Sequence, residues 1–587
     1  MLAYRDLLGT LEPCVITDAD DAVVWEMESF GFLAGARPAT VHPGLWRLSR
    51  RAARHGLYQV CAGIYQVRGF DMSNMTLVES EHGVIVIDPL TSAEKATAAL
   101  RLYRRHRGER AVVAVAHTHP HGSHGGGVLG VVDTDTRVPI IAPANFLDEV
   151  ARAEPVAPAV LRRGAYCSGA ALPHGPRGKV DIEATADPCT PAPYLLAPTL
   201  EITDTGMDEE IDGVRMIFQI VPGAGGPTEM NIYFPGARAL FMAEQVGQSM
   251  QDVVPLPGAR TRDARTRSRG IAEAIELFAG ELEVVFAAHH WPTSGRAEAL
   301  ALLRDHRDMY AYLHDQTVRR INQGYTGIEI AEELRLAPQL TAQPHTAGRT
   351  GSIVQNVKAT YQHYLGWYDG NPAHLWPHPP SARAARYVAL LGGVAATLRR
   401  TREFAAAGDL RFAAELGSHA VFADPDDPDA RTTLAEVFER LGHGAECAAW
   451  RNCYLSGAAE LRYGRGHPTR HRRIGAAQAL SITQLFDTIA TTIDGPRAWF
   501  QQLSIRWVFT DSAEVYHMEL SNGALIHHPQ RRPQPADLEV TLTKPGLLEL
   551  LDTGSLAHVR TSGDTAVWYR LLATTDAADP DFPIVTP

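Results

Sequence analysis

The sequence lacks three features: paired cysteines, a long apolar run and an excess of basic residues. Its six cysteines are scattered through 587 residues without the closely spaced pairs of a cysteine zinc site, which predicts free thiols in a reducing compartment. No stretch has the length of a membrane span. The first residues, MLAYRDLLGTLEPC, mix charges into a short apolar run and so lack the apolar core of a signal peptide. We therefore expect a cytoplasmic protein without stable membrane insertion.

The charge balance argues against another class of partner. The formal net charge is −12, whereas nucleic acids and anionic membranes are bound by basic surfaces. Arginine-rich stretches at 399–402 and 470–473 are local exceptions, which we interpret as solvated helix faces or linkers. The sequence therefore predicts no nucleic-acid partner.

What is present is the composition of an ordinary globular protein, with 45% hydrophobic and 21% charged residues. A chain of this length exceeds a single core and should form two to four domains. Strands alternating with helices predict an α/β layered domain first, followed by a helical region rich in alanine and leucine, and then a compact α+β module. The expected segments are an N-terminal extension (1–56), the α/β domain (57–297), the helical domain (298–463), a basic linker (464–479) and the C-terminal module (480–587).

Local patterns give the expected elements. The α/β domain also contains a stretch at 142–204, rich in proline, glycine and alanine, that we expect to form long loops. Breaks between helices are expected near Asp409 and Pro425. Expected strands are 64–67, 83–88, 111–116, 214–221, 239–242, 283–287, 504–509, 514–520 and 538–542, and expected helices include 92–106, 482–489 and 547–551.

The chemistry of the sequence is concentrated at 113–127, VAVAHTHPHGSHGGG. A buried strand ends there in a loop of four histidines and then turns on glycines. Imidazole is a common neutral ligand for zinc and similar metals. His119 and His121 could hold one ion, and His124, one turn later, could reach a second. A loop of exposed histidines is the less favoured alternative.

This segment resembles a known signature. Thr118-His119-x-His121-x-Ser123-His124-x-Gly126 is similar to the T-H-x-H-x-D-H-x-G motif of the metallo-β-lactamase superfamily, with serine in place of aspartate. Further stretches resemble one branch of it, the alkylsulfatases, in the same order along nearly the whole chain. They lie at 57–91, 229–235, 241–244, 286–292, 365–372, 421–425 and 582–587.

The resemblance implies an architecture and a chemistry. The expected fold is a metallo-β-lactamase αββα sandwich, an all-α dimerisation domain that pairs two chains into a homodimer, and an α+β module similar to sterol-carrier proteins. Alkylsulfatases hold two zinc ions that activate water, and they hydrolyse sulfate esters of alkyl chains. Metal-activated water, rather than a side chain, is the expected nucleophile.

The resemblance also implies a ligand set. His119 and His121 correspond to ligands of the first metal, Glu244 to the bridging carboxylate, and His124 and His289 to ligands of the second metal. We choose His289 over His290 because it comes first after the preceding strand.

Two ligand positions depart from the family pattern. The aspartate of the second metal is replaced by Ser123, and the glutamate of the first metal falls on Gly225. These losses remove two donors and two negative charges, so affinity for at least one ion should fall. We expect one or two zinc ions, or another divalent metal. His117 is an extra imidazole that could compensate, and Glu229 is interpreted as a structural carboxylate.

The expected sulfate pocket is altered as well. Three anion donors of the family pattern are replaced by Ser168, Pro257 and Gln355. Candidate substrate-binding residues that still fit the pattern are Arg177, Arg262 and Lys358. Loss of several donors argues for changed specificity.

Two functions remain open. The first is a metal-dependent hydrolase acting on a sulfate ester or a related small amphipathic substrate, with altered specificity. The alternative is a family member that has lost sulfatase activity and binds a ligand or catalyses a different metal-dependent reaction. In the C-terminal module, Trp499, Phe500, Trp507 and Phe509 are expected in the core, with an apolar cavity as the alternative.

Overall fold

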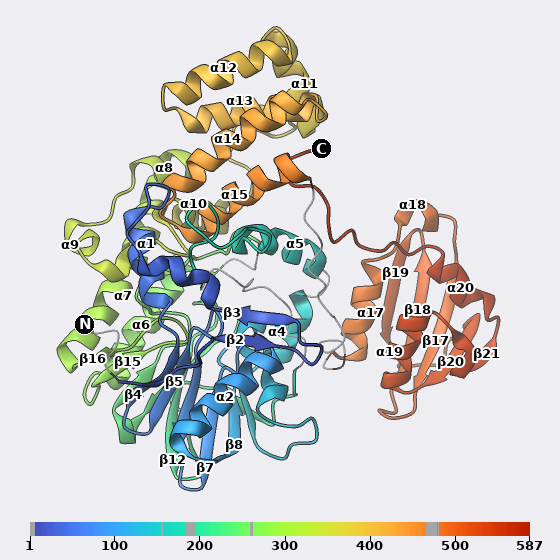
Figure 1. The fold of residues 1–587 in the computed structure, drawn as a ribbon. Helices are drawn as coiled ribbons and strands as arrows, with labels where there is room; N and C mark the ends of the chain where they lie inside the picture. The colour runs from blue at the N-terminus through green and yellow to red at the C-terminus, as the bar shows by residue number, and fades with distance from the viewer. Residues whose placement is uncertain (1–5, 154–155, 183–194, 259–261, 465–477, 479) are drawn as a thin grey trace. The chain divides into compact units, whose positions relative to one another are not determined.

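The computed structural model describes residues 6–153, 156–182, 195–258, 262–464, 478 and 480–587. The chain folds into two units (Figure 1). The first contains Met1–Phe146, Ala159–Thr469 and Asp581–Pro587, and the second contains Leu147–Pro158 and Arg470–Pro580. The chain therefore passes between the units four times. Most of the predicted linker at 464–479 lies outside the described residues, and the domain boundaries drawn from the sequence remain predictions.

Two sheets form the centre of the first unit. One has eight strands in the order β1-β4-β5-β6-β7-β8-β9-β10, and the other has six in the order β11 to β16. The first sheet comprises β1 Leu7–Gly9, β4 Gly56–Cys61, β5 Ile64–Arg68, β6 Met75–Glu79, β7 Gly83–Ile87, β8 Ala111–Ala116, β9 Ile140–Pro143 and β10 Leu200–Ile202. The second comprises β11 Asp208–Ile211, β12 Val214–Ile220, β13 Met230–Phe234, β14 Ala239–Phe241, β15 Val284–Phe286 and β16 Thr293–Ser294.

The two sheets pack face to face, with a layer of helices outside each. Strand β7 lies between two of these layers. It is buried on both faces, and its sequence is therefore a continuous apolar run. Ile85 and Ile87 point into the core between the sheets, whereas Val84 and Val86 pack under α2 (Ala93–Arg107). The second sheet is covered by α6 (Ala264–Phe278) and α7 (Arg296–Ile321). This is the αββα sandwich predicted from the sequence.

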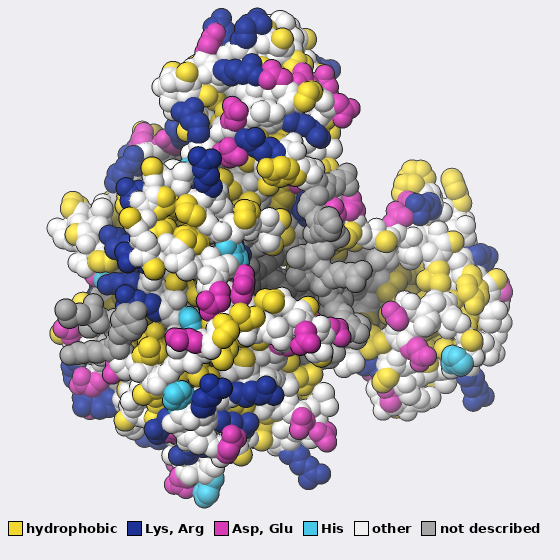
Figure 2. Space-filling model, viewed as in Figure 1, with side chains coloured by type: hydrophobic (Ala, Val, Ile, Leu, Met, Phe, Trp, Pro, Cys, Tyr) yellow, Lys and Arg dark blue, Asp and Glu magenta, His cyan; other side chains and the backbone are white. Residues whose placement is uncertain are grey.

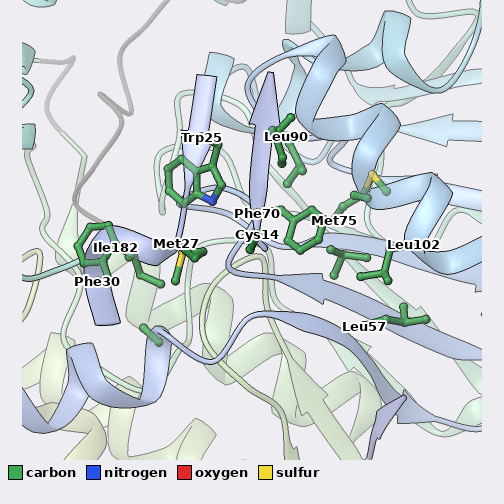
Figure 3. Packing of buried hydrophobic residues seen from close by; sticks show 14 of the residues in the cluster. Cys14, Trp25, Met27, Phe30, Leu57, Phe70, Met75, Leu90, Leu102 and Ile182 are labelled. Atoms are coloured by element: carbon green, nitrogen blue, oxygen red, sulfur yellow. The ribbon is translucent and has the colours of Figure 1, made fainter. Parts of the chain in front are cut away.

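The N-terminal segment is part of this sandwich. Strand β1 pairs with β4 at the edge of the first sheet, and β2 (Val15–Thr17) pairs with β3 (Val23–Glu26). Cys14, Trp25, Met27 and Phe30 lie in one buried cluster with Phe70, Met75, Leu90 and Leu102 (Figure 3). Helix α1 (Pro43–Ala52) adds Leu45 and Trp46 to the same cluster. Residues 6–56 thus complete the outer layer of the first sheet.

One expectation within the sandwich is wrong. The stretch 142–204, expected as long loops, contains two helices, α4 (Phe146–Ala153) and α5 (Ala157–Ser168), and strand β10. Alanine, leucine and arginine are strong helix formers, and in α5 they outweigh the single proline near its start. Residues 183–194 lie outside the described part of the chain.

The helical region follows as predicted. Aspartates start two of its helices: Asp409 accepts from the Phe412 amide before α13, and Asp427 accepts from the Asp429 and Ala430 amides before α14. On the face shown in Figure 2, both acidic and basic side chains lie over α11 to α14. The helices after α7 are α8 Gly327–Glu333, α9 Pro338–Thr341, α10 Ile353–Leu365, α11 Pro380–Leu390, α12 Val394–Ala406, α13 Leu410–Ala423, α14 Pro428–Gly444 and α15 Ala448–Tyr463.

The second unit is a five-stranded sheet in the order β19-β18-β17-β20-β21, packed against helices. Strand β17 alternates, so that Trp507 and Phe509 enter the core, whereas Trp499 and Phe500 are 58% and 94% exposed. The expected core packing is therefore confirmed for Trp507 and Phe509 and wrong for Trp499 and Phe500, and the alternative of one cavity lined by all four aromatics is wrong as well. The elements are β17 Leu503–Phe509, β18 Val515–Ser521, β19 Ala524–Pro529, β20 Leu538–Leu542, β21 Arg560–Gly563, α17 Ile482–Ala490, α18 Gly495–Ala498, α19 Lys544–Thr553 and α20 Ala566–Leu572.

Candidate metal centre

Three loops meet at one end of the sandwich. Strand β8 is parallel to β7, and β14 is parallel to β15, so the residues that follow these strands leave their sheets at the same ends. The loop after β8 carries the histidine-rich segment, the loop after β14 carries Glu244, and the loop after β15 carries His289. A backbone hydrogen bond from Met230 to the Thr118 carbonyl (2.9 Å) ties the histidine loop to the second sheet. The sandwich thus places these residues in one site.

The carboxylate of Glu244 lies at the centre of four imidazoles. Its Oε1 is 3.0 Å from His124 Nε2, 3.3 Å from His289 Nε2 and 3.4 Å from His119 Nε2. Its Oε2 is 3.4 Å from His121 Nδ1. The structure therefore brings together all five ligands expected from the sequence.

The arrangement fits a metal. His119 Nε2, His121 Nδ1 and His124 Nε2 are buried, and none makes a well-aligned hydrogen bond within the described residues despite their closeness to Glu244. Two sets of three ligand atoms, each within 4.8 Å of one another, share this carboxylate: His119 with His121, and His124 with His289. Three protein ligands and one open position are typical of catalytic zinc. Orphaned nitrogens converging on one carboxylate are the donor set of such a centre.

Hydrogen bonds at the nitrogen that faces away from Glu244 orient the rings of His119 and His289. Asp88 accepts from the Thr118 hydroxyl (2.7 Å), which leaves that oxygen to accept from His119 Nδ1 (2.8 Å). His289 Nδ1 donates to the Met72 carbonyl (3.1 Å). In both histidines the proton is thus placed on Nδ1, so the Nε2 lone pair faces the centre.

His121 is held differently. Its Nε2 is 3.1 Å from Arg262 Nη2, and a guanidinium only donates hydrogen bonds. His121 Nε2 therefore accepts, and in the neutral ring the proton is on Nδ1, the nitrogen that faces Glu244. A metal at Nδ1 would require this proton to move to Nε2, where Arg262 offers a donor and no acceptor. In His119, His124 and His289 the nitrogen away from the centre faces an acceptor, so the set that contains His121 is less well prepared for a metal.

The site distributes charge unevenly. Burial lowers the pKa of His119 to about 4, against the opposing charge of Glu244, so this ring is neutral at pH 7. Burial would also lower the pKa of His124, but its hydrogen bond to Asp88 and the nearby charge of Glu244 outweigh it and raise the pKa to about 10. Without metal, His124 carries the proton that the carboxylates attract.

Sequence reasoning gave Asp88 no role. It directly follows β7 and accepts from the Thr118 amide (3.0 Å), the Thr118 hydroxyl and His124 Nδ1 (3.4 Å). Its backbone has a φ of 53°, which lets the carboxylate turn back under the histidine loop. The sequence feature that could have indicated Asp88 is its position directly after a buried parallel strand. Asp88 orients a ligand rather than facing the substrate pocket.

The two departures from the family pattern have structural counterparts. The Ser123 hydroxyl is buried without a hydrogen-bond partner among the described residues. Near Gly225, the Glu229 carboxylate fills the space beside the backbone, accepting from the Gly225 amide (2.6 Å), the Gly226 amide (3.2 Å) and the Glu244 amide (3.2 Å). Burial raises the pKa of Glu229. Glu229 thus supports the backbone of the loops, as interpreted from the sequence.

Two further histidines lie outside the ligand sets. His117 is buried and stacked on Phe146, and burial lowers its pKa to about 4. His290 is turned toward Gln248 and Ser249, with its Nδ1 accepting from the Gln248 amide (3.3 Å). His289 is therefore the histidine of this pair that faces Glu244.

A pocket of about 690 Å³ opens onto the centre. Arg262 lies in its wall beside Glu244 and His289, together with Asp252, whose pKa is raised by burial. The other two expected substrate-binding residues do not line it: Arg177 is exposed in a loop, and Lys358 is on the exposed side of α10. Apolar wall residues are Met72, Pro255, Leu256, Pro257 and Ala449.

Ser168 and Gln355, which replace two anion donors of the family pattern, are engaged in local hydrogen bonds. Ser168 lines the pocket, but its hydroxyl donates to the Ala165 carbonyl (3.3 Å). Gln355 is occupied by the Val254 carbonyl and the Trp450 indole. Arg262 is therefore the guanidinium that the described pocket offers to an anion.

Family models match most of the chain. Residues 68–289 match the family model described as metallo-beta-lactamase superfamily. Residues 326–464 match the model described as alkyl sulfatase dimerisation, and residues 473–587 match the one described as alkyl sulfatase C-terminal. The chain is 37% identical to a linear primary-alkylsulfatase of Pseudomonas sp over 602 residues (100% of this chain, 89% of that protein). It is 38% identical to the alkyl/aryl-sulfatase BDS1 of Saccharomyces cerevisiae over 601 residues (100% and 92%).

A solved structure gives the same result. The stereoselective inverting sec-alkylsulfatase Pisa1 from Pseudomonas sp. superposes with a TM-score of 0.95 at 35% identity, covering 100% of this chain and 94% of that one. Among the described residues, no helix is long and apolar enough to span a membrane. The relatives and the domain matches support a metallo-hydrolase of the sulfatase type. The chain belongs to the alkylsulfatase family of the metallo-β-lactamase superfamily.

Proposed function

We propose that the protein is a metal-dependent hydrolase of sulfate esters whose specificity differs from that of typical alkylsulfatases. The observation that carries this proposal is the convergence of His119, His121, His124 and His289 on Glu244 at the floor of a pocket. When bound, a zinc ion supplies Lewis acidity and activates water near neutral pH. We propose one firmly held ion per chain, because the His124–His289 set is better prepared than the set containing His121.

The pocket suits a small amphipathic substrate. Arg262 is 5% exposed and offers a guanidinium to sulfate oxygens beside the metal ligands. Met72, Leu256 and Pro257 supply an apolar wall for the alkyl group. Because Pro257 has no donor and the Ser168 hydroxyl is turned to its own helix, fewer groups hold the sulfate than the family pattern provides. Tight binding of long primary alkyl sulfates is therefore not expected.

The side chains of the pocket have separate roles in the proposed hydrolysis. Glu244 and the imidazoles hold the metal, and Arg262 orients the ester by its charge. Asp252, in the wall of the same pocket, is buried enough for its pKa to be raised and can donate a proton to the departing oxygen. We therefore assign Asp252 as a proton donor.

The test measures inorganic sulfate released from three esters by the zinc-loaded protein: dodecyl sulfate, a short secondary alkyl sulfate and an aryl sulfate. We expect release from at least one, with dodecyl sulfate the slowest. Glu244→Gln is the matched control and should lose both metal and activity. If zinc-loaded protein binds the esters without releasing sulfate, the ligand-binding alternative replaces this proposal.

The assembly is proposed to be a homodimer. Within residues matched to the dimerisation domain, Trp367, Trp376 and Leu390 are 74%, 95% and 83% exposed. Apolar side chains this exposed are typical of surfaces that contact another chain. A cytoplasmic location stays a prediction from the sequence.

A further inference from the structure

Three arginines line a second hollow, separate from the substrate pocket. Arg51 is at the end of α1, Arg54 follows that helix, and Arg68 ends β5. The hollow has a volume of about 390 Å³, much of it open to solvent. Its wall also contains Tyr58 and Trp291. No part of the proposed hydrolysis uses these arginines.

Arg68 is the informative residue. Its Nε donates to Gln66 Oε1 (3.3 Å), and its guanidinium lies 4.5 Å from the centre of the Tyr58 ring. Its Nη2 is buried and has no hydrogen-bond partner in the described part of the chain. Burial lowers the pKa of Arg68 to about 10, so the group is still charged at neutral pH. A buried guanidinium with an unused donor is costly unless an anion accompanies it.

The described walls of the hollow contain a single carboxylate, and it is already engaged. Asp71 accepts from the Lys95 ammonium (3.1 Å), the Met72 amide (2.8 Å) and the Thr91 amide (2.8 Å). Its charge is therefore balanced by Lys95 rather than by Arg68. Arg51 lies over the Trp291 ring, 5.1 Å from the ring centre, at the exposed side of the hollow. Asp71 is thus the carboxylate among the lining residues, and the charge of Asp6, which lies outside the lining, opposes the effect of burial on the pKa of Arg68 only in part.

We propose that this hollow is a binding site for a tetrahedral oxyanion, either inorganic sulfate or inorganic phosphate. The planar fork of a guanidinium matches two oxygens of such an anion, and Arg51 and Arg68 both line the hollow. The anion supplies the acceptor that Arg68 Nη2 lacks. It also offsets the charge that burial makes unfavourable.

Two short segments of the chain separate this hollow from the substrate pocket. Met72 and His289 face the substrate pocket, whereas their chain neighbours Asp71 and His290 face the hollow. Asn74 joins the two loop segments that form this wall, because its side-chain amide donates to the His290 carbonyl (2.8 Å) and its backbone amide donates to the Ala288 carbonyl (2.7 Å). Under the proposed function sulfate is the product, so a bound sulfate would sit behind a metal ligand. This last step rests on the proposed function, whereas binding of the anion does not.

The test is an equilibrium titration of the full-length protein with sodium sulfate and, separately, sodium phosphate at constant ionic strength set with sodium chloride. Arg51→Gln and Arg68→Gln should each weaken anion binding by about ten-fold or more, because each removes a charged donor pair. Arg47→Gln, on an exposed position of the same helix, is the matched control and should change nothing. Arg262→Gln removes the anion donor of the substrate pocket, so binding that survives it belongs to the hollow.

Two outcomes would overturn the site: binding that survives Arg51→Gln and Arg68→Gln together, or binding abolished by Arg262→Gln. If Arg68→Gln does not fold, Arg51→Gln and crystals soaked in selenate decide, since an anomalous peak beside Arg51 and Arg68 is expected. A preference for sulfate over phosphate identifies the product as the ligand, and equal affinity identifies a general oxyanion site. Because no turnover is needed, an inactive protein that still binds sulfate would refute the proposed hydrolysis and leave the site intact.

Discussion

Glu229 occupies the space in which a side chain at Gly225 would begin. A Cβ on Gly225 would be 2.7 Å from Glu229 Oε2, a distance that real Cβ atoms do not show. The same carboxylate holds the Gly225 and Glu244 amides. The position that holds a metal-binding glutamate in the family pattern is therefore filled by a neighbour that supports the loop of another ligand.

This relationship separates two substitutions that look equivalent in the sequence. Gly225→Glu should lower the melting temperature, with a cost of about 1–3 kcal/mol for overpacking, and should not add a metal. Ser123→Asp should raise the metal content per chain, because the Ser123 hydroxyl is buried beside His124 without a partner in the described structure. Gly225→Ala is the control for the Cβ alone. Elemental analysis after dialysis that shows a gain for Gly225→Glu would contradict this prediction.

A second prediction concerns the two halves of the centre. His289→Ala should lose the firmly bound metal, with affinity reduced by more than the ten- to hundred-fold typical when a residue that only orients a ligand is lost. His121→Ala should retain more metal, because Arg262 offers a donor to His121 Nε2 and so disfavours the tautomer that a metal at Nδ1 needs. Metal content and zinc affinity of both variants provide the comparison. The opposite order would show that the first set holds the tighter ion.

Asp252 gives a third prediction, based on leaving groups. Asp252→Asn should slow hydrolysis of alkyl sulfates by about a hundred-fold, because an alkoxide leaves poorly without a proton. Aryl sulfates, with a more acidic leaving group, should be affected much less. Equal losses for both kinds of ester, with unchanged metal content, would mean that Asp252 is not the proton donor.

The fourth prediction concerns acid stability. His306 Nε2 donates to the Gly247 carbonyl (2.8 Å), Arg267 and His345 lie nearby, and burial lowers the pKa of His306 from 6.5 to about 3. An unfolded chain takes up this proton below pH 6.5, whereas the folded chain resists until about pH 3. The stability associated with neutral His306 is thus present above pH 6.5 and is lost as the pH falls toward 3.

His306→Gln keeps a donor but does not titrate, so its melting temperature should fall less steeply than that of the wild type between pH 6.5 and about pH 4.5. The exposed His363→Gln is the matched control. Parallel curves for the wild type and His306→Gln would refute the assignment.

The last prediction is the assembly. Static light scattering at micromolar concentration should give twice the 63.9 kDa of one chain. Trp376→Ser combined with Leu390→Ser should shift the mass toward the monomer, since both side chains are exposed and apolar. Leu277→Ser, at a half-exposed position outside the matched dimerisation domain, should not. A monomer mass for the wild type would exclude the homodimer.

Much of the fold was predictable where the local pattern carries the information. Strand β8 agrees with its predicted bounds, because its sequence is an unbroken apolar run whose second half, Ala114 to Ala116, is fully buried. The histidine spacing after it pointed to the metal centre for the same local reason. Helix α5 was missed because glycine and proline around it suggest loops.

Contacts between distant residues were not predictable. The Met72 carbonyl holds His289 across 217 positions, and the proximity of Arg262 to His121 spans 141. Neither follows from a spacing rule, because each depends on how the two sheets pack. The roles of Asp88 and Arg68 were missed for this reason: their partners are set by the tertiary fold.

The path of the chain between the two units bears on proteolysis. The segment Arg470–Pro580 is joined to the first unit at both ends, and the chain closes with Asp581–Pro587 back in the first unit, where Glu460 accepts from the Ile584 and Val585 amides (2.9 and 3.2 Å). Ala151, from the separate piece Leu147–Pro158, packs in the core of the second unit. A protease that cuts once between the units therefore produces a nicked protein whose fragments stay joined, and release of the second unit takes two cuts and the loss of a helix from its core.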